Sequence, residues 1–415
     1  MQNLVIDPTL AASGQDKIDW VKSYTPVLNR IKTSFEDSKP FKGLRIATAI
    51  HLEAKTARLA DVLRAGGAEL FVTGCNPLST QDDVAEALRA DGYHVFARHG
   101  VNMEEYYEHL KQTLACHPHL IIDDGGDFTQ MLLGPLKEYA DCMIGGCEET
   151  TTGILRLQAW DRDGVMSYPM MAVNDGDCKH LFDNRYGTGQ STLTALMAVT
   201  NLNIASRIVV VAGYGWCGKG VAMRAKGMGA QVIVTEVDPV KAIEAAMDGF
   251  QVMPMDEAAA LGDLFITLTG CRDVIRGEHF KKMKDGALLA NSGHFDVEIC
   301  IPELRELAVK EWQRKPDITG YQLADGRIIN LLAEGRLVNL AAGMGHPAEI
   351  MDMSFALQAK CLEYLALNRG SLENKLYQVP RKIDLAVARM KLEALGVTID
   401  QLTPEQEKYL AGYMD

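Results

Sequence analysis

Side chains that can carry out acid–base chemistry follow five short apolar runs in the first half of the chain. The runs span residues 44–50, 69–73, 119–122, 142–144 and 169–173. The polar groups after them are His51, Asn76, Asp123–Asp124, Glu148–Glu149 and Asn174–Asp175, with Lys179 and Asp183 just beyond. Such runs are typical of buried parallel strands, whose carboxyl ends meet at one edge of a sheet. Singly these residues could be surface or turn residues, but together they predict a catalytic site at that edge.

A glycine-rich loop in the second half has the pattern of a dinucleotide site. The run 207–212 ends in Gly213-Tyr-Gly215-Trp-Cys-Gly218, a helical stretch follows over 221–228, and the next run, 231–235, ends in Glu236. The glycines let backbone NH groups reach a pyrophosphate at the helix N-terminus. A carboxylate accepts hydrogen bonds from a ribose diol and repels a 2′-phosphate, so the loop favours NAD over NADP. A tight turn without a ligand is the alternative.

Two more runs, 263–268 and 286–290, continue this unit. They end at Thr269 and Asn291, and His294 comes shortly after. Because ligands of open α/β sheets lie outside the carboxyl ends of the strands, these residues are expected on the cofactor side. The fold class expected from both halves is α/β, with two doubly wound Rossmann-like domains.

The composition limits the class of protein and its partners. A length of 415 residues with 47% hydrophobic and 23% charged residues predicts a globular protein of two domains. The net charge of −13, without a basic run, argues against nucleic acid or a membrane as partner. The sequence shows no leader-like or membrane-spanning run, and we expect a cytoplasmic protein. Nine cysteines without a CxxC pair predict free thiols and no dedicated metal site.

Taken in order, these groups resemble the motifs of the S-adenosylhomocysteine hydrolase family over nearly the whole chain. The matching strings are residues 79–82, 123–127, 148–152, 173–175, 182–184, 213–215, 293–296, 336–339 and 345–347. The resemblance implies reversible hydrolysis of S-adenosylhomocysteine to adenosine and homocysteine. It also implies a tightly held NAD, reduced and reoxidised within each turnover, and a homotetramer.

The resemblance further implies a role for each site residue. Oxidation of the 3′-hydroxyl to a ketone acidifies the C4′ proton, so that the 5′ thiol can leave and water can add. Lys179 and Asp183 would act at the 3′-hydroxyl, with the lysine pKa lowered by burial and by a nicotinamide cation. The other implied groups are His51 and Asp124 at the C4′ proton, Glu149 and Asn174 at the ribose hydroxyls and the lysine, His294 at the 5′ position, and His346 at a gate. The implied cofactor residues are Thr150, Thr151, Thr152, Asn184, Gly213, Gly215, Gly218, Glu236, Thr269, Asn291 and Asn339.

The family also implies an interrupted domain order. The substrate domain would comprise residues 1–182 and 346–375, the NAD-binding domain residues 183–345, and a short helical C-terminal segment residues 376–415. Two hinges would then flank the cofactor domain, and closure would exclude water from the ketone. The sequence ends without the family's tail that carries a Lys and a Tyr to a neighbouring cofactor, so reduced cover of the cofactor is expected.

The purine pocket departs from the family pattern. The segment His51-Leu-Glu53-Ala-Lys55-Thr56 has Lys55 where the family commonly has Glu or Gln. Lysine only donates hydrogen bonds, which suits O6 of hypoxanthine if Glu53 accepts from N1–H. It also suits adenine if Glu53 accepts from N6 and Lys55 donates to N1. S-inosylhomocysteine therefore stays open as a substrate. Near the cofactor, Lys241 and Leu268 replace residues that contact the adenosine ribose in the family.

Two rival functions remain at this point. A catalytically silent NAD-binding regulator would share the fold, but the complete set of acid–base residues argues against it. An ordinary NAD dehydrogenase would release NADH, whereas this chain carries groups for both oxidation and elimination.

Overall fold

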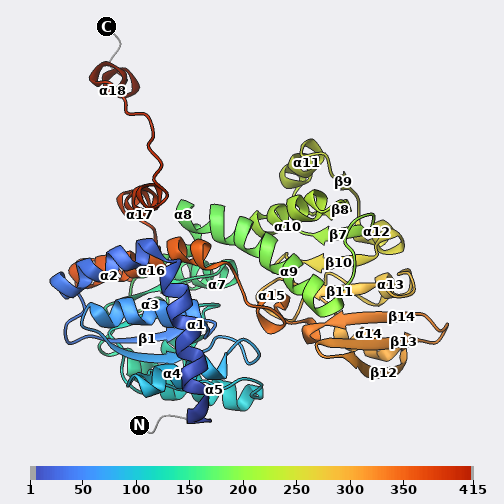
Figure 1. Cartoon of the computed structure of the whole chain (residues 1–415), viewed down its shortest axis with the longest axis horizontal. Helices are drawn as coiled ribbons and strands as arrows, with labels where there is room; N and C mark the ends of the chain where they lie inside the picture. The colour runs from blue at the N-terminus through green and yellow to red at the C-terminus, as the bar shows by residue number, and fades with distance from the viewer. Residues whose placement is uncertain (1–5, 413–415) are drawn as a thin grey trace.

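The chain builds two open sheets that lie side by side (Figure 1). The computed structural model describes residues 6–412, so the first five and last three residues of the expected domains lie outside the described part. The first sheet contains β1 (Arg45–Ala49), β2 (Glu69–Thr73), β3 (His94–Val95), β4 (Leu120–Asp123), β5 (Gly145–Glu148), β6 (Met170–Ala172) and β15 (Leu376–Gln378). The second contains β7 (Ile208–Ala212), β8 (Gln231–Thr235), β9 (Gln251–Val252), β10 (Leu264–Thr267), β11 (Leu288–Asn291), β12 (Ala308–Lys315), β13 (Ile318–Leu323) and β14 (Ile328–Leu332).

Both sheets are doubly wound. Their orders are β3-β2-β1-β4-β5-β6-β15 and β9-β8-β7-β10-β11-β14-β13-β12. The first sheet is parallel throughout, whereas β12 and β13 add an antiparallel edge to the second. The strand order reverses between β1 and β4 and between β7 and β10, which is where ligands bind in such sheets. The predicted fold class of two doubly wound Rossmann-like units is confirmed.

Helices cover both faces of each sheet. The first sheet packs against α2 (Pro26–Ser38), α3 (Ala54–Ala65), α4 (Asp82–Ala90) and α16 (Ala348–Leu367) on one face, and against α5 (Met103–Leu114), α6 (Asp127–Leu133) and α7 (Thr151–Arg162) on the other. The second packs against α9 (Thr188–Thr200), α10 (Trp216–Gly227) and α11 (Pro239–Met247), and against α12 (Met255–Leu261), α13 (Gly277–Phe280) and α14 (Ile301–Leu307). The remaining helices are α1 (Ala11–Ser23), α8 (Asp177–Lys179), α15 (Val338–Ala341), α17 (Arg381–Ala394) and α18 (Pro404–Leu410). Successive residues of β7 alternate between the two apolar clusters, as burial on both faces requires.

The first sheet is assembled from two distant parts of the chain. Helix α16 packs on α2, α3 and β5, and β15 pairs with β6, although the whole second sheet precedes both in sequence. We call the regions around the two sheets the first and second domains; their expected boundaries stay predictions. The segment from residue 376 contains the expected helices, but its first residues form a strand that the sequence analysis did not anticipate. Helix α18 projects away from both domains (Figure 1). Within residues 6–412, no helix is both long and apolar enough to cross a membrane.

Strand β5 lies later than the sequence predicted. The expected strand at 142–144 is loop, and the pairing residues are Gly145 to Glu148, which were expected to follow the strand. The sequence did not predict this strand because glycine is not typical of strands, unlike the β-branched residues. Here the glycines allow close packing: a Cβ on Gly146 would lie 2.4 Å from Ile121 Cγ1 and 2.7 Å from Met170 Sδ. Glu148 therefore lies inside β5, and Glu149 directly follows the strand.

This packing predicts the effect of one methyl group. Gly146→Ala should destabilise the first domain by about 1–3 kcal/mol because the core must shift to admit the Cβ. Gly227→Ala is the matched control, since nothing lies within 4 Å of the added Cβ at the end of α10. Urea denaturation of both variants measures the difference. Equal midpoints would contradict the tight approach of β4, β5 and β6.

Candidate active site

A buried cavity between the two domains collects the predicted acid–base residues. It is lined by all six of the predicted catalytic residues, His51, Asp124, Glu149, Lys179, Asp183 and His294. Glu53, Lys55, Thr56, His346, Thr150, Asn184 and Asn339 line it as well. The lining residues that the sequence analysis missed are Ile50, Thr188, Cys217, Ser292, Leu337, Leu340, Met351 and Phe355. The carboxyl ends of both sheets therefore face one common site.

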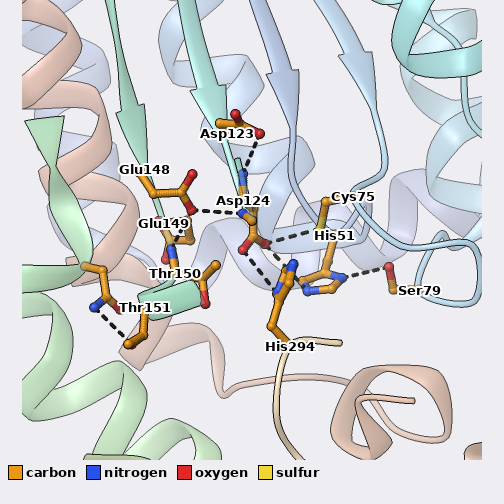
Figure 2. A network of polar contacts seen from close by, with 12 residues as sticks. His51, Cys75, Ser79, Asp123, Asp124, Glu148, Glu149, Thr150, Thr151 and His294 are labelled. Atoms are coloured by element: carbon orange, nitrogen blue, oxygen red, sulfur yellow. Dashed lines mark hydrogen bonds and ion pairs between the residues drawn. The ribbon is translucent and has the colours of Figure 1, made fainter. Parts of the chain in front are cut away.

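Three side chains converge at one side of the cavity (Figure 2). His51 Nε2 lies 3.5 Å from Asp124 Oδ2, and His294 Nδ1 lies 3.7 Å from Asp124 Oδ1. They follow β1, β4 and β11, so the two sheets together build this group. Burial lowers the pKa of His51 to about 4, and the neighbouring Asp124 charge only partly opposes this. His51 is therefore a neutral imidazole at neutral pH and can accept a proton.

Two other buried carboxyls hold the loops that carry this group. Asp123 accepts hydrogen bonds from the backbone NH groups of Asp124, Phe128 and Thr129 at 2.8 to 3.3 Å. Glu148 Oε1 accepts from the NH groups of Gly125 and Thr150, both at 2.9 Å, and so joins the ends of β4 and β5. Their role is structural, and they position Asp124 and Glu149.

Lys179 lies at the centre of a second polar cluster. Its Nζ donates to Asn184 Oδ1 at 2.8 Å and to Asn174 Oδ1 at 3.2 Å. It also lies 3.4 Å from Asp183 Oδ1 and 3.6 Å from Glu149 Oε1. A π-helical stretch, residues His180–Gly187, follows Lys179 and places Asp183 and Asn184 around it. Asn174 does not line the cavity itself but orients the lysine.

The charges of this cluster differ from the expectation for Lys179. Burial alone would lower the lysine pKa, but Asp183, Glu149 and Asp124 outweigh burial and raise it. The expectation that the pKa of Lys179 is lowered is therefore wrong when the charges of the protein alone act on it. Burial also raises the pKa of Glu149 to about 8, although Lys179 opposes this, whereas the lysine and His346 hold the pKa of Asp183 well below its usual range. Near neutral pH, Glu149 is the carboxyl in this cluster that can exchange a proton.

Helix α16 supplies two contacts that the sequence analysis did not anticipate. Ser354 Oγ donates to Asp183 Oδ2 at 2.8 Å, and Gln358 Nε2 donates to Glu149 Oε2. Both side chains are fully buried. Two polar residues four apart in the otherwise apolar stretch 353–359 are the signal that could have revealed them, because they occupy one face of the helix.

The cavity wall also holds an ion pair at the predicted purine position. Lys55 Nζ lies 2.6 Å from Glu53 Oε2 and donates to the Met344 carbonyl at 3.0 Å. Thr56 Oγ1 donates to the His51 carbonyl at 2.6 Å. His346 lines the cavity too: its Nδ1 lies 3.1 Å from Asp183 Oδ1, and its Nε2 lies 3.2 Å from Thr188 Oγ1.

The glycine-rich loop has the geometry that a dinucleotide needs. Gly213 has a φ of +100°, a Cβ on Gly218 would lie 2.0 Å from the Gly213 carbonyl oxygen, and a Cβ on Gly215 would point into open space. Glu236 Oε2 accepts from the Tyr214 NH at 2.7 Å at the end of β8. The buried Asn339 Oδ1 accepts no hydrogen bond from any residue in the described range, so it is free for a ligand donor such as a carboxamide. These features fit NAD.

The other predicted cofactor residues lie outside the cavity wall. Thr151 and Thr152 begin α7, and Thr151 Oγ1 accepts from Asn174 Nδ2. Thr269 is exposed, and its hydroxyl donates to Glu298. The Asn291 amide bonds to the carbonyls of Gly293, Phe295 and Gly335, so it holds the loop that carries His294.

Known proteins of one family match both parts of the chain. Residues 184–345 match the model described as S-adenosyl-L-homocysteine hydrolase, NAD binding domain, and residues 2–144 match the model described as S-adenosyl-L-homocysteine hydrolase. The predicted NAD-binding Rossmann domain is thereby confirmed.

Relatives of similar length carry two different names. Adenosylhomocysteinase of Thermococcus kodakarensis is 57% identical over 409 residues, 99% of this chain and 97% of the relative. Adenosylhomocysteinase of Aquifex aeolicus is 55% identical over 99% of this chain and 98% of the relative. S-inosyl-L-homocysteine hydrolase of Methanocaldococcus jannaschii is 55% identical over 99% of both chains. The chain belongs to the S-adenosyl-L-homocysteine hydrolase family.

Proposed function

We propose that the protein hydrolyses S-adenosyl-L-homocysteine reversibly to adenosine and L-homocysteine, with NAD as its resident cofactor. The observation that carries the proposal is the convergence of all six predicted acid–base residues on one buried cavity beside the NAD-binding domain. When bound, NAD supplies an acceptor for the 3′ hydride and later returns it. The homotetramer implied by the resemblance and the cytoplasmic location expected from the sequence belong to this proposal.

The residues around Lys179 act on the ribose. The lysine ammonium holds the 3′ oxygen, and Glu149 takes the hydroxyl proton, since the pKa of Glu149 is the one raised to about 8. Asp183 keeps the lysine charged and is itself held by Ser354 and His346. Closure of the two domains over the substrate would exclude water from the ketone until the thiol has left.

The residues around Asp124 act on C4′ and C5′. The neutral His51 and Asp124 take the C4′ proton as the C5′–sulfur bond breaks, and His294 protonates the departing thiolate. The oxygen of a water molecule then adds to C5′ while the proton that it releases goes back to His294, and His51 with Asp124 returns the proton to C4′. Asp124 lies between both imidazoles and so serves both positions.

Turnover of two thioethers tests the function. The holoenzyme should release homocysteine from S-adenosyl- or S-inosylhomocysteine without net formation of NADH, because the hydride returns in each cycle. Steady accumulation of NADH would instead indicate a dehydrogenase. Retained NAD with no thiol release from either compound would indicate a regulator.

The Glu53–Lys55 pair is compatible with S-inosylhomocysteine as a second candidate substrate. Of the three Lys55 hydrogens, two are used by Glu53 and the Met344 carbonyl, and the third can be donated to a base. That donor fits O6 of hypoxanthine or N1 of adenine.

Lys55→Gln should move the ratio of the two kcat/KM values toward the adenosyl substrate, because glutamine can accept from the N6 amino group. The change should be on the order of tenfold, as for one base-reading hydrogen bond of about 1–1.5 kcal/mol. Lys282→Gln, at an exposed ion pair with Asp256, is the matched control. An unchanged ratio in the Lys55 variant would mean that Lys55 does not read the base.

The pH dependence of kcat tests the role of Glu149. Its carboxylate form, which accepts the proton, is populated only above its raised pKa, so kcat should rise with pH and level off above about 8. Glu149→Gln should remove this rise of kcat with pH and lower kcat by about 10²- to 10⁴-fold.

Glu148→Gln is the matched control for that experiment. Glu148 is equally buried but does not line the cavity, and a glutamine oxygen can still accept from Gly125 and Thr150. In Glu148→Gln, kcat should still rise with pH. If this rise is lost in Glu148→Gln, or remains in Glu149→Gln, a group other than Glu149 causes it.

A further inference from the structure

Helix α17, near the C-terminus, contacts the short helix α8 that carries Lys179. It packs on α2, α8 and α16 (Figure 1). The residues that α17 buries are Ile383, Asp384 and Val387. A carboxylate among two aliphatic side chains needs hydrogen-bond donors, because burial without them is costly. The donors of Asp384 are therefore informative.

Asp384 accepts hydrogen bonds from two consecutive backbone NH groups of α8. Its Oδ2 accepts from the NH of Asp177 and its Oδ1 from the NH of Cys178, both at 2.8 Å. The Cys178 thiol also donates to the Asp384 carbonyl at 3.3 Å. These NH groups lie in the first turn of α8, where no carbonyl of the same helix can accept from them. A side chain from a distant part of the sequence thus satisfies the start of this helix.

The backbone of Lys179 depends on this start, because Lys179 directly follows Cys178. The NH groups of Lys179 and His180 both donate to the Gly176 carbonyl at 3.0 Å and complete the turn. The π-helical residues that carry Asp183 continue from the same turn. A lysine ammonium ends a flexible four-carbon stem, so it keeps one position only if the backbone beneath it is fixed.

We propose that Asp384 is a positioning residue for the reaction: it fixes the backbone of α8 so that the Lys179 ammonium meets the 3′ oxygen. The inference rests on the proposed function, in which Lys179 holds that oxygen. Asp384 acts through the backbone of α8, since its own side chain does not line the cavity. The segment that follows residue 375 thereby contributes to catalysis.

The chain offers a matched control in Asp352 of α16. Its Oδ1 accepts from the NH of Leu28 at 2.9 Å, and its Oδ2 accepts from the NH of Val27 at 3.2 Å, at the start of α2. Asp352 is buried like Asp384 and does not line the cavity either. Ser354, two residues further on, projects from nearly the opposite side of α16. The same kind of contact is therefore present at α2, which carries none of the predicted site residues.

Amide hydrogen exchange of the NAD-loaded protein tests the geometry without turnover. Asp384→Ala should speed exchange over residues 177–184 by about tenfold, as for the loss of one or two hydrogen bonds. Asp352→Ala should instead speed exchange at the start of α2 and leave residues 177–184 unchanged. Unchanged exchange over residues 177–184 in Asp384→Ala would overturn the proposal.

Rapid mixing of the holoenzyme with adenosine tests the effect on the reaction. The amplitude of NADH formation counts the folded, NAD-loaded sites, whereas its rate constant reports the geometry within each site. Asp384→Ala should lower this rate constant by about 10- to 100-fold, because a misplacement of about 1 Å at the reacting atoms costs up to that much. Asp384→Asn keeps one acceptor and should lower it less. Asp352→Ala should change the amplitude only.

The two readouts separate a positioning role from a merely structural one. A lowered amplitude with an unchanged rate constant in Asp384→Ala would overturn the proposal. If that variant does not fold, an unchanged rate constant in Asp384→Asn would overturn it. Absence of NADH formation in the unaltered holoenzyme would contradict the proposed function and the role of Lys179. Faster exchange in Asp384→Ala would still support the hold of Asp384 on α8.

Discussion

The burial of several carboxyl groups in the cavity between the two domains is the constraint on which the rest of the structure depends. Asp124, Glu149 and Asp183 are buried side chains that line one cavity, where an unpaired charge is costly. The protein meets this cost in different ways: Lys179 compensates the charge of Asp183, and burial raises the pKa of Glu149 to about 8. In the proposed mechanism, this difference in pKa gives similar side chains different proton-transfer roles.

Much of this site could be predicted from the sequence because parallel sheets bring the ends of their strands together. The apolar runs before His51 and Asp124 revealed strands, and the glycine loop after β7 revealed the cofactor side. A position after a strand implies a position at the sheet edge. Nothing more than local pattern was needed for that inference.

The rest depends on contacts between distant segments. Strand β5 is glycine-rich because its neighbours pack too closely for side chains, which a single sequence does not reveal. Ser354 and Gln358 reach the carboxyls only because α16 returns to the first domain. The pKa of Lys179 depends on the carboxylates of Asp183, Glu149 and Asp124, which come from separate parts of the chain. Together they raise this pKa, although burial alone would lower it.

The return of α16 and β15 to the first sheet also affects how the protein is made. A ribosome completes all strands of the second sheet before it releases residues 348–378. The second domain can therefore fold during synthesis, whereas the first must wait with the surface beneath α16 uncovered, since Phe355, Leu357 and Leu362 fill it only later. Slow translation or termination before α16 is complete would leave this apolar face exposed, and such nascent chains would be prone to aggregate.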